Sequence, residues 1–206
     1  MIPLKLKIKD AEDINCTLPT SWKDVTMKQF IQLYKHREDI DKHPELELVV
    51  YTGVDQHIWN ALTLDQIALV YDKLKYLEAD EVDFPSLPVP DKITIGEQEV
   101  EVPKQFGKKA WGAIKGIVAE RNANKGADNE IIPLAIAFMM YDDYSNEKFD
   151  EDKARELIPL IEEMPCTVAY PVGSFFLKVL KHWRRNGQKS STKNQKQSIS
   201  LQVLTA

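Results

Sequence analysis

The four histidines and two cysteines of this 206-residue chain are scattered along it, and no group of residues forms a catalytic motif. Neither cysteine, Cys16 or Cys166, lies at a metal-ligand spacing from a histidine. No phosphate-binding GxxxxGK[ST] loop and no dinucleotide-binding GxGxxG motif occurs. The sequence therefore predicts no catalytic residue, no metal and no cofactor, and a protein that is not an enzyme. The four histidines are His36, His43, His57 and His182.

An acidic run between Asp142 and Asp152 is superficially similar to a calcium-binding loop. It lacks the DxDxDG ligand order and the central glycine that an EF-hand turn requires. Acidic side chains are favoured at the start of a helix. We therefore interpret the run as a solvated loop followed by a helix that Asp150 caps.

The C-terminal end carries the clearest electrostatic signal. Seven of the 27 basic residues lie between Lys178 and Lys196, where no acidic residue occurs, which leaves 20 basic and 32 acidic residues elsewhere. An acidic body with a basic arm is a pattern typical of interaction with another macromolecule. The candidate contact residues next to the last expected helix are Lys178, Lys181, Trp183, Arg184 and Arg185.

Trp183 allows three interpretations. Its ring can stack on a nucleic-acid base while the neighbouring cations contact phosphate. It can equally anchor a protein interface, where Trp and Arg are enriched. In the third interpretation the cations simply complement the dipole at a helix C-terminus.

Composition places the chain among globular proteins, since 43% of the residues are hydrophobic and 29% are charged. No stretch of 18 uncharged apolar residues occurs, so no membrane contact is expected. The alternation of Lys with apolar residues at the N-terminus argues against a signal peptide. Two cysteines give no disulfide framework, which indicates a reducing cytoplasm.

The predicted fold is mainly α, with seven or eight helices and a small β element. Period-2 alternation predicts a strand over residues 4–9. Capping boxes at Thr26–Gln29 and Thr63–Gln66 begin two helices, which end near residues 37 and 79. A short helix over 44–51 and a turn at 55–59, with Trp59 in the core, complete this half.

Prolines break the helical pattern after residue 80. Alternating runs at 92–95 and 99–102 flank Gly96 and predict a β-hairpin, which packs on a helix or pairs with the strand at 4–9. Helices follow over 106–124, with Trp111 in the core, then over 129–141, 150–163 and 170–183. The expected parts are a strand plus helices at 1–79, a Pro-rich linker and hairpin at 80–103, helices at 104–187 and an extended tail at 188–206.

Three finer features accompany the C-terminal helices. Pro133 falls in the first turn of the apolar helix over 129–141, and Pro159 kinks or ends the helix over 150–163. Gly112 and Gly116 form a GxxxG pair in a charged helix, for which close helix packing is the favoured explanation.

Three stretches resemble morphogenesis proteins of tailed bacteriophages, especially phages of Bacteroidetes hosts. They are Leu18-Pro-Thr-Ser-Trp-Lys-Asp-Val-Thr-Met-Lys-Gln-Phe30, Leu48-Val-Val-Tyr-Thr-Gly-Val-Asp55 leading into Leu62-Thr-Leu-Asp65, and Phe149–Glu156 continuing to Met164–Leu177. The resemblance implies a small, mostly helical virion or assembly factor. It carries over no functional residue, because the matching positions form the fold.

The expected function is a non-catalytic structural or assembly protein of the phage head–tail or tail region. Its partners are then other phage structural proteins and further copies in a ring, and its location is the virion, assembled in the bacterial cytoplasm. One alternative is a tail assembly chaperone that leaves before completion. Another is a nucleic-acid-binding protein that uses the basic arm.

The polar tail ends in alternating apolar residues, among them Leu201 and Val203. Because exposed ion pairs contribute only about 0–1 kcal/mol each, charge alone does not hold a ring. We expect residues 188–206 to be disordered in the monomer and extended against another chain in the assembly. Ile199, Leu201 and Val203 then add a strand to a neighbouring sheet edge, such as the hairpin at 93–102.

Overall fold

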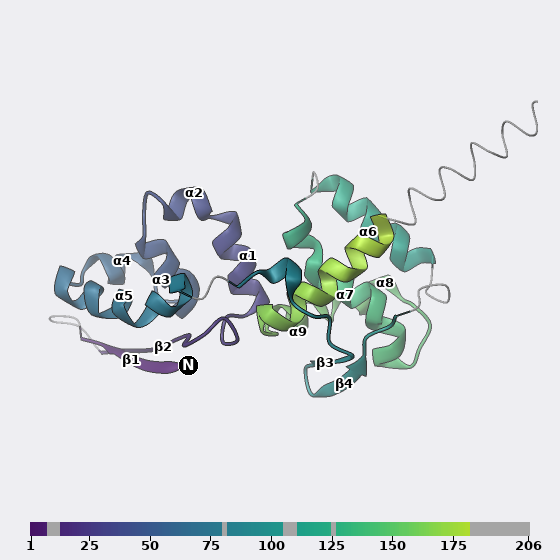
Figure 1. Ribbon diagram of the computed structural model, residues 1–206, viewed down its shortest axis with the longest axis horizontal. Coiled ribbons are helices and arrows are strands. Elements are labelled where there is room, and N and C mark those ends of the chain that lie inside the picture. Colours follow the sequence, from purple (N-terminus) through teal and green to yellow (C-terminus); the bar gives the residue numbers. More distant parts are fainter. Residues whose placement is uncertain (8–12, 80–81, 105–110, 125–126, 182–206) are drawn as a thin grey trace, which may run out of the picture.

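A computed structural model describes residues 1–7, 13–79, 82–104, 111–124 and 127–181, with side chains for all of these except 76–79. The protein is mainly helical and has two small antiparallel strand pairs, which confirms the predicted fold class. Figure 1 shows the elements gathered into an N-terminal lobe and a C-terminal lobe. The tail expected at 188–206 lies outside the described residues.

The first sheet consists of β1 (Ile2–Leu6) and β2 (Ile14–Leu18), which pair antiparallel with Leu4 opposite Cys16. The expected strand at 4–9 is confirmed in type, although it begins and ends earlier. Its partner is β2, which was not predicted from the sequence, and not the distant hairpin. Ile14, Cys16 and Leu18 also alternate with polar residues, and a local antiparallel pair closes only a short loop.

The next helices are α1 (Met27–Lys35) and the single turn α2 (Arg37–Ile40). The predicted capping box of α1 is confirmed: the Gln29 N–H donates to Thr26 Oγ1 (3.2 Å), and the Thr26 N–H donates to Gln29 Oε1 (2.9 Å). Trp22 packs edge-on against Phe30 with ring centroids 6.5 Å apart. These contacts fix the direction in which the chain enters α1.

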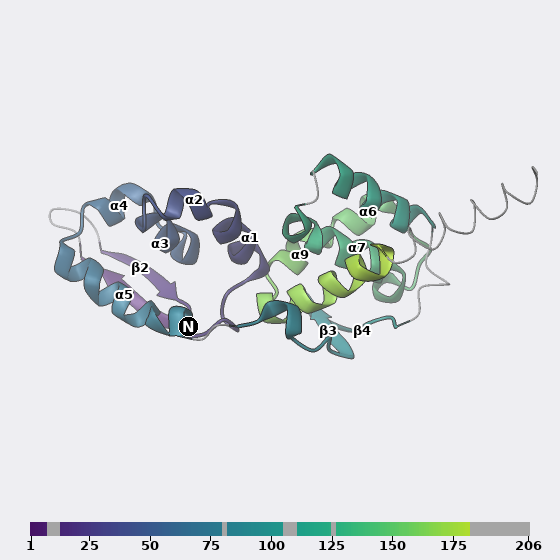
Figure 2. The same ribbon diagram turned by 45° about the horizontal axis from the view of Figure 1, so that its top comes forward.

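Three helices complete the N-terminal lobe: α3 (Glu45–Thr52), α4 (Gln56–Asn60) and α5 (Leu64–Ala79). Gly53 ends α3 in the left-handed conformation (φ 69°), which glycine adopts without steric cost. The second capping box is confirmed by the Thr63 N–H, which donates to Gln66 Oε1 (2.9 Å). Trp59 is 1% exposed, as predicted. In Figure 2 the β1–β2 pair lies between α3 and α5.

The second sheet follows the 3₁₀ turn η1 (Phe84–Ser86) and consists of β3 (Lys92–Ile95) and β4 (Gln98–Glu101). The predicted hairpin is confirmed, and Gly96 adopts φ 60° at its turn. Val100 faces the core while its neighbours face solvent. The Gln98 side chain donates to the C=O of Tyr144 (2.8 Å), so the hairpin packs on a helix of the C-terminal lobe.

The centre of the C-terminal lobe is α7 (Asp128–Ser145), which packs on α6 (Trp111–Ala123). The residues from Ile131 to Tyr141 are all buried, as the apolar pattern predicts. Pro133 lies in the second turn rather than the first, because the helix begins at Asp128. A Cβ on Gly116 would lie 2.5 Å from the Phe138 ring, which confirms close packing as the role of this glycine.

Trp111 corrects the predicted core: its exposed fraction is 73%. The inward face of α6 is formed instead by Ala113, Ile114 and Ile117, and Trp111 starts the helix on another side. Trp111 is the first residue of α6, so only the residues that follow it on the helix support its assignment to the buried face. The spacing of apolar residues therefore predicted the exposure of its side chain wrongly.

The helix predicted over 150–163 is two short helices, α8 (Glu151–Arg155) and α9 (Ile158–Glu162). Asp150 caps α8 by accepting the Lys153 N–H (3.1 Å), as predicted. Pro159 stands in the first turn of α9, where its missing N–H costs nothing, so it begins a helix there. The last described helix extends over residues 166–181.

The two lobes join where the loop before α1 contacts the start of this last helix. The Met27 N–H donates to the Met164 C=O (2.8 Å), and the Cys166 N–H donates to the Val25 C=O (2.8 Å). An aromatic cluster of Trp22, Phe30, Phe84 and Tyr170 joins the same segments, with ring centroids 4.8–6.5 Å apart. The junction is therefore built from segments far apart in the sequence.

The helices outnumber the seven or eight predicted. Within the described ranges, α1 to α9 and residues 166–181 are helical. The excess comes from α2, which the sequence pattern did not separate, and from the break between α8 and α9. None of the helices in the described part of the chain is long and apolar enough to cross a membrane.

Candidate interaction site

Lys178 and Lys181 are the predicted contact residues that the structure describes. Both are exposed on the helix of residues 166–181, whose other side is buried through Val172, Phe176 and Leu180. A spacing of three places the two lysines on one face of the helix. Trp183, Arg184, Arg185, Leu201 and Val203 lie outside the described residues.

The two lysines line a hollow of ≈ 260 Å³ beside Arg121 of α6. Arg121 is held by Asp128, with Nε 2.6 Å from Oδ1 and Nη2 2.7 Å from Oδ2. A bidentate pair of this kind is well ordered, and it partly neutralises the guanidinium. The lysine ammonium groups are therefore the cations of this hollow that remain available to a partner.

A second hollow, of ≈ 810 Å³, follows β4 on the C-terminal lobe. We call it the β4 groove. One side is the strand itself and the segment to Lys104, and the other is the end of α7. Among the described strands β4 pairs with β3 alone, so the groove borders a sheet edge. Its charged lining consists of Asp91, Lys92, Glu99, Glu101, Lys104, Asp142 and Asp143.

The electrostatics of the β4 groove are acidic, because five carboxylates face two lysines in this lining. Lys92 Nζ lies 2.7 Å from Glu99 Oε1, and Lys104 Nζ lies 2.6 Å from Asp91 Oδ1. The hydrogen bond from Lys104 lowers the pKa of Asp91, and the same contact raises the pKa of Lys104. The C-terminus of α7 adds the negative end of its dipole.

This groove was not predicted from the sequence. The acidic run was interpreted as a solvated loop and a helix cap, and the cap is confirmed for Asp150. Asp142 and Asp143, however, stand in the last turn of α7 and face the hairpin. Their position directly after the apolar run was the available signal, because the end of a buried helix lies near other core elements.

Both cysteines are held in settings that suppress their reactivity. Cys16 and Cys166 are free thiols. Burial raises the pKa of Cys166 to about 12 and raises the pKa of Cys16 as well, which suppresses the reactive thiolate. Among the described residues, no group of three His, Cys, Asp or Glu side chains is placed to hold a metal ion.

Comparison of the chain with protein-family models, with curated proteins and with solved structures finds no match.

Proposed function

We propose that this protein is a non-catalytic structural or assembly component of the head–tail or tail region of a tailed phage, and that it acts by contact with its own copies and with other structural proteins. The observation that carries the proposal is the acidic β4 groove at a sheet edge, in a chain whose C-terminal arm is basic from Lys178 to Lys196. Complementary surfaces of this kind favour association between copies.

The two surfaces occupy different places on the C-terminal lobe. Lys178 and Lys181 border α6, while the β4 groove borders the end of α7, and their linings share no residue. A contact between such different patches is heterologous, and it generates a ring when the rotation between subunits closes. This geometry suits the repeated, symmetric environment of a phage tail or neck.

The stretches that resemble phage morphogenesis proteins support the same proposal. Residues 18–30 and 164–177, which carry two of them, meet at the junction between the lobes through the bonds of Met27 and Cys166. Thr26 and Pro165 also form an isolated β-bridge there. These two stretches therefore help to hold the lobes together, which is the kind of role that a structural component requires.

Charge reversal in the β4 groove tests self-association. We expect Glu101→Lys to weaken association of the full-length chain about threefold to tenfold in sedimentation equilibrium at 50 mM NaCl, since close charge pairs contribute on this scale. Glu97→Lys is the matched control, because Glu97 is exposed on the same hairpin but does not line the groove. Equal effects of both variants, or a monomer at all concentrations, contradict the proposed contact.

Mass spectrometry of purified particles separates the structural role from the alternatives. The proposal predicts that the protein is present in particles of the phage that encodes it, at a constant copy number. Absence from the particles favours the chaperone, which binds during assembly and leaves. A salt-dependent shift of DNA or RNA that is lost on deletion of residues 178–206 favours the nucleic-acid-binding alternative.

A further inference from the structure

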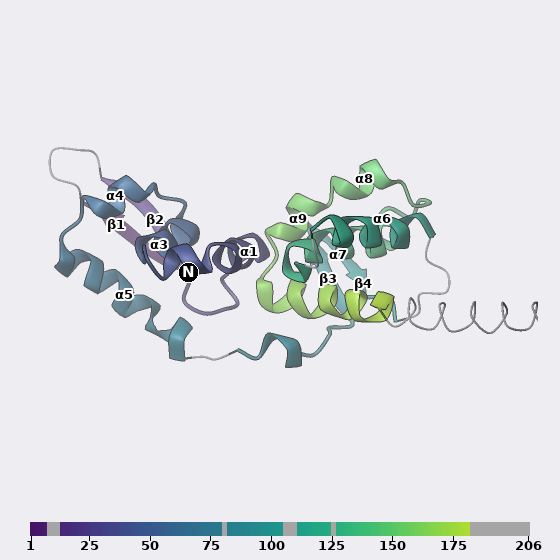
Figure 3. The ribbon, with the colours of Figure 1, turned by 90° about the horizontal axis from the view of Figure 1, so that it is seen from above.

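A third hollow, of ≈ 420 Å³, lies on the N-terminal lobe between β1 and α5. We call it the β1 groove. The consecutive residues 4–7 form one side, and Leu62, Leu69 and Val70 form the apolar part of the other. Figure 3 shows α5 set apart from α3 and α4 in the N-terminal lobe. The groove therefore has residues 4–7 along one side and Leu62 with one face of α5 along the other.

The strand beside this groove has an edge that can accept another strand. Among the described strands β1 pairs with β2 alone, in a register from Ile2↔Leu18 to Leu6↔Ile14. Four residues of strand extend about 13 Å, enough to pair with a peptide segment of similar length. An unpaired edge next to an apolar wall is the arrangement that proteins use to bind extended peptides.

Side chains in the groove specify the kind of segment. Leu69 is 66% exposed on α5 although it is apolar, so covering it releases water from a large apolar surface. Among the residues that the structure describes, the charged lining residues are Lys5, Lys7 and Lys73, and none of the lining residues is a carboxylate. Lys5 already has a partner in Asp13, 2.7 Å away. Lys7 and Lys73 are both exposed and face an incoming chain.

We propose that the β1 groove binds an extended acidic segment of a partner protein, in which apolar and acidic residues alternate. The segment adds as a strand to the free edge of β1. Its apolar side chains lie on the side of Leu4, Leu6 and Leu69, and its carboxylates lie on the side of Lys5 and Lys7. Period 2 on both strands makes the two patterns match. This binding does not depend on the phage function proposed above.

The test uses a blocked peptide of four Glu-Val repeats with Gly-Ser ends, titrated into the full-length protein and followed by fluorescence anisotropy and NMR. Leu69→Glu is expected to weaken binding about tenfold or more, since it places a charge in the apolar wall. Leu64→Glu is the matched control: Leu64 is on the same helix, is 87% exposed, and does not line the groove. Both positions are exposed, so both variants are expected to fold.

Two further readouts identify the binding mode. The backbone amides of residues 4–7 are expected to shift on titration with the Glu-Val peptide, and a Lys-Val repeat peptide is expected to leave these amides unshifted. Shifts confined to the C-terminal lobe, or equal losses in the Leu69 and Leu64 variants, overturn the proposal. Self-association that Leu69→Glu abolishes in the absence of peptide also overturns it, because the occupant is then a second copy.

Discussion

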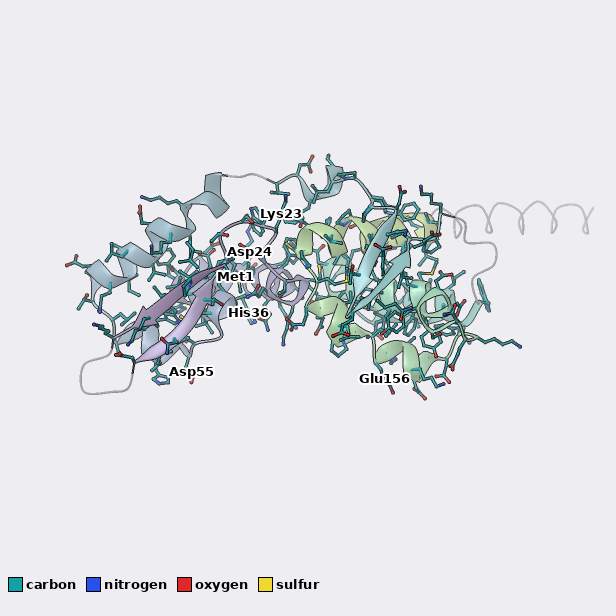
Figure 4. All side chains as sticks on the ribbon, turned by 90° about the horizontal axis from the view of Figure 1, so that it is seen from below. Met1, Lys23, Asp24, His36, Asp55 and Glu156 are labelled. Carbon is teal, nitrogen blue, oxygen red and sulfur yellow. The ribbon has the colours of Figure 1, made fainter. Side chains whose placement is uncertain are left out.

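The β1 groove and the β4 groove are both hollows between a two-stranded sheet and a helix, but their charged side chains have opposite signs. The first lies between β1 and α5, and the second lies between the β3–β4 pair, mainly β4, and the end of α7. Both sheets lie on the same side of the molecule, which faces the viewer in Figure 4. The first groove is lined by lysines and leucines, and the second mainly by carboxylates.

The comparison indicates that the fold provides an unpaired strand edge in both places, whereas the side chains around each edge determine which segment binds there. Backbone groups at a strand edge bind any extended segment, so affinity from this source is not selective. Selection comes from charge and from apolar area. We therefore expect the two grooves to bind different segments, one acidic and one basic.

The largest expected effect, on the free energy of unfolding, comes from truncating the buried side chain that anchors each sheet to the core. Leu18 on β2 and Ile95 on β3 are fully buried. We expect Leu18→Ala or Ile95→Ala to lower the free energy of unfolding by about 2–5 kcal/mol, because each leaves a cavity in the core. Urea denaturation measures this loss. A change below about 1 kcal/mol in either variant contradicts the role of these anchors.

A smaller effect is expected at the turn of the β3–β4 hairpin. Gly96 adopts φ 60°, where a Cβ is strained. Gly96→Ala is expected to lower the free energy of unfolding by about 1 kcal/mol, and Gly96→Asn by less, because Asn tolerates the left-handed region. Thermal or urea unfolding of the three proteins gives the comparison. Equal stability of the Ala variant and the unmodified chain contradicts the strain.

Local signals in the sequence predicted much of the fold. The capping boxes at Thr26 and Thr63, the glycine turn at Gly96 and the cap at Asp150 depend on residues within a few positions of each other. The buried α7 followed from its uninterrupted apolar run. The strand β2 was missed, because a five-residue alternation after a run of mostly polar residues is a weak pattern.

The two grooves could not be predicted from the sequence, because each is lined by residues that lie far apart along the chain. Leu69 and residues 4–7 are more than 60 positions apart, and Asp142 and Glu101 more than 40. Only tertiary packing brings each pair to one groove. The exposure of Trp111 has a similar reason, since periodicity indicates a face but does not say where a neighbouring element ends.

The smallest expected effect concerns pH. Asp13 and Asp91 each accept a hydrogen bond from a lysine, Lys5 and Lys104, and the pKa of each carboxyl therefore lies below the ordinary value of 3.8. A lowered folded-state pKa contributes stability above that ordinary value, and the contribution is lost as the pH falls through the folded pKa. Lys5→Ala is expected to raise the pKa of Asp13 and leave that of Asp91 unchanged in an NMR titration. If Lys5→Ala raises the pKa of both Asp13 and Asp91, the two carboxyl groups do not belong to separate local ion pairs.

One NMR experiment tests the comparison most directly. The full-length protein is titrated separately with the Glu-Val repeat peptide and with the Lys-Val repeat peptide. We predict that the acidic peptide shifts the amides of residues 4–7 and 62–73, and that the basic peptide shifts those of residues 99–104 and 142–146. If both peptides shift the same amides, or if neither shifts any, the two grooves are not binding sites of opposite charge.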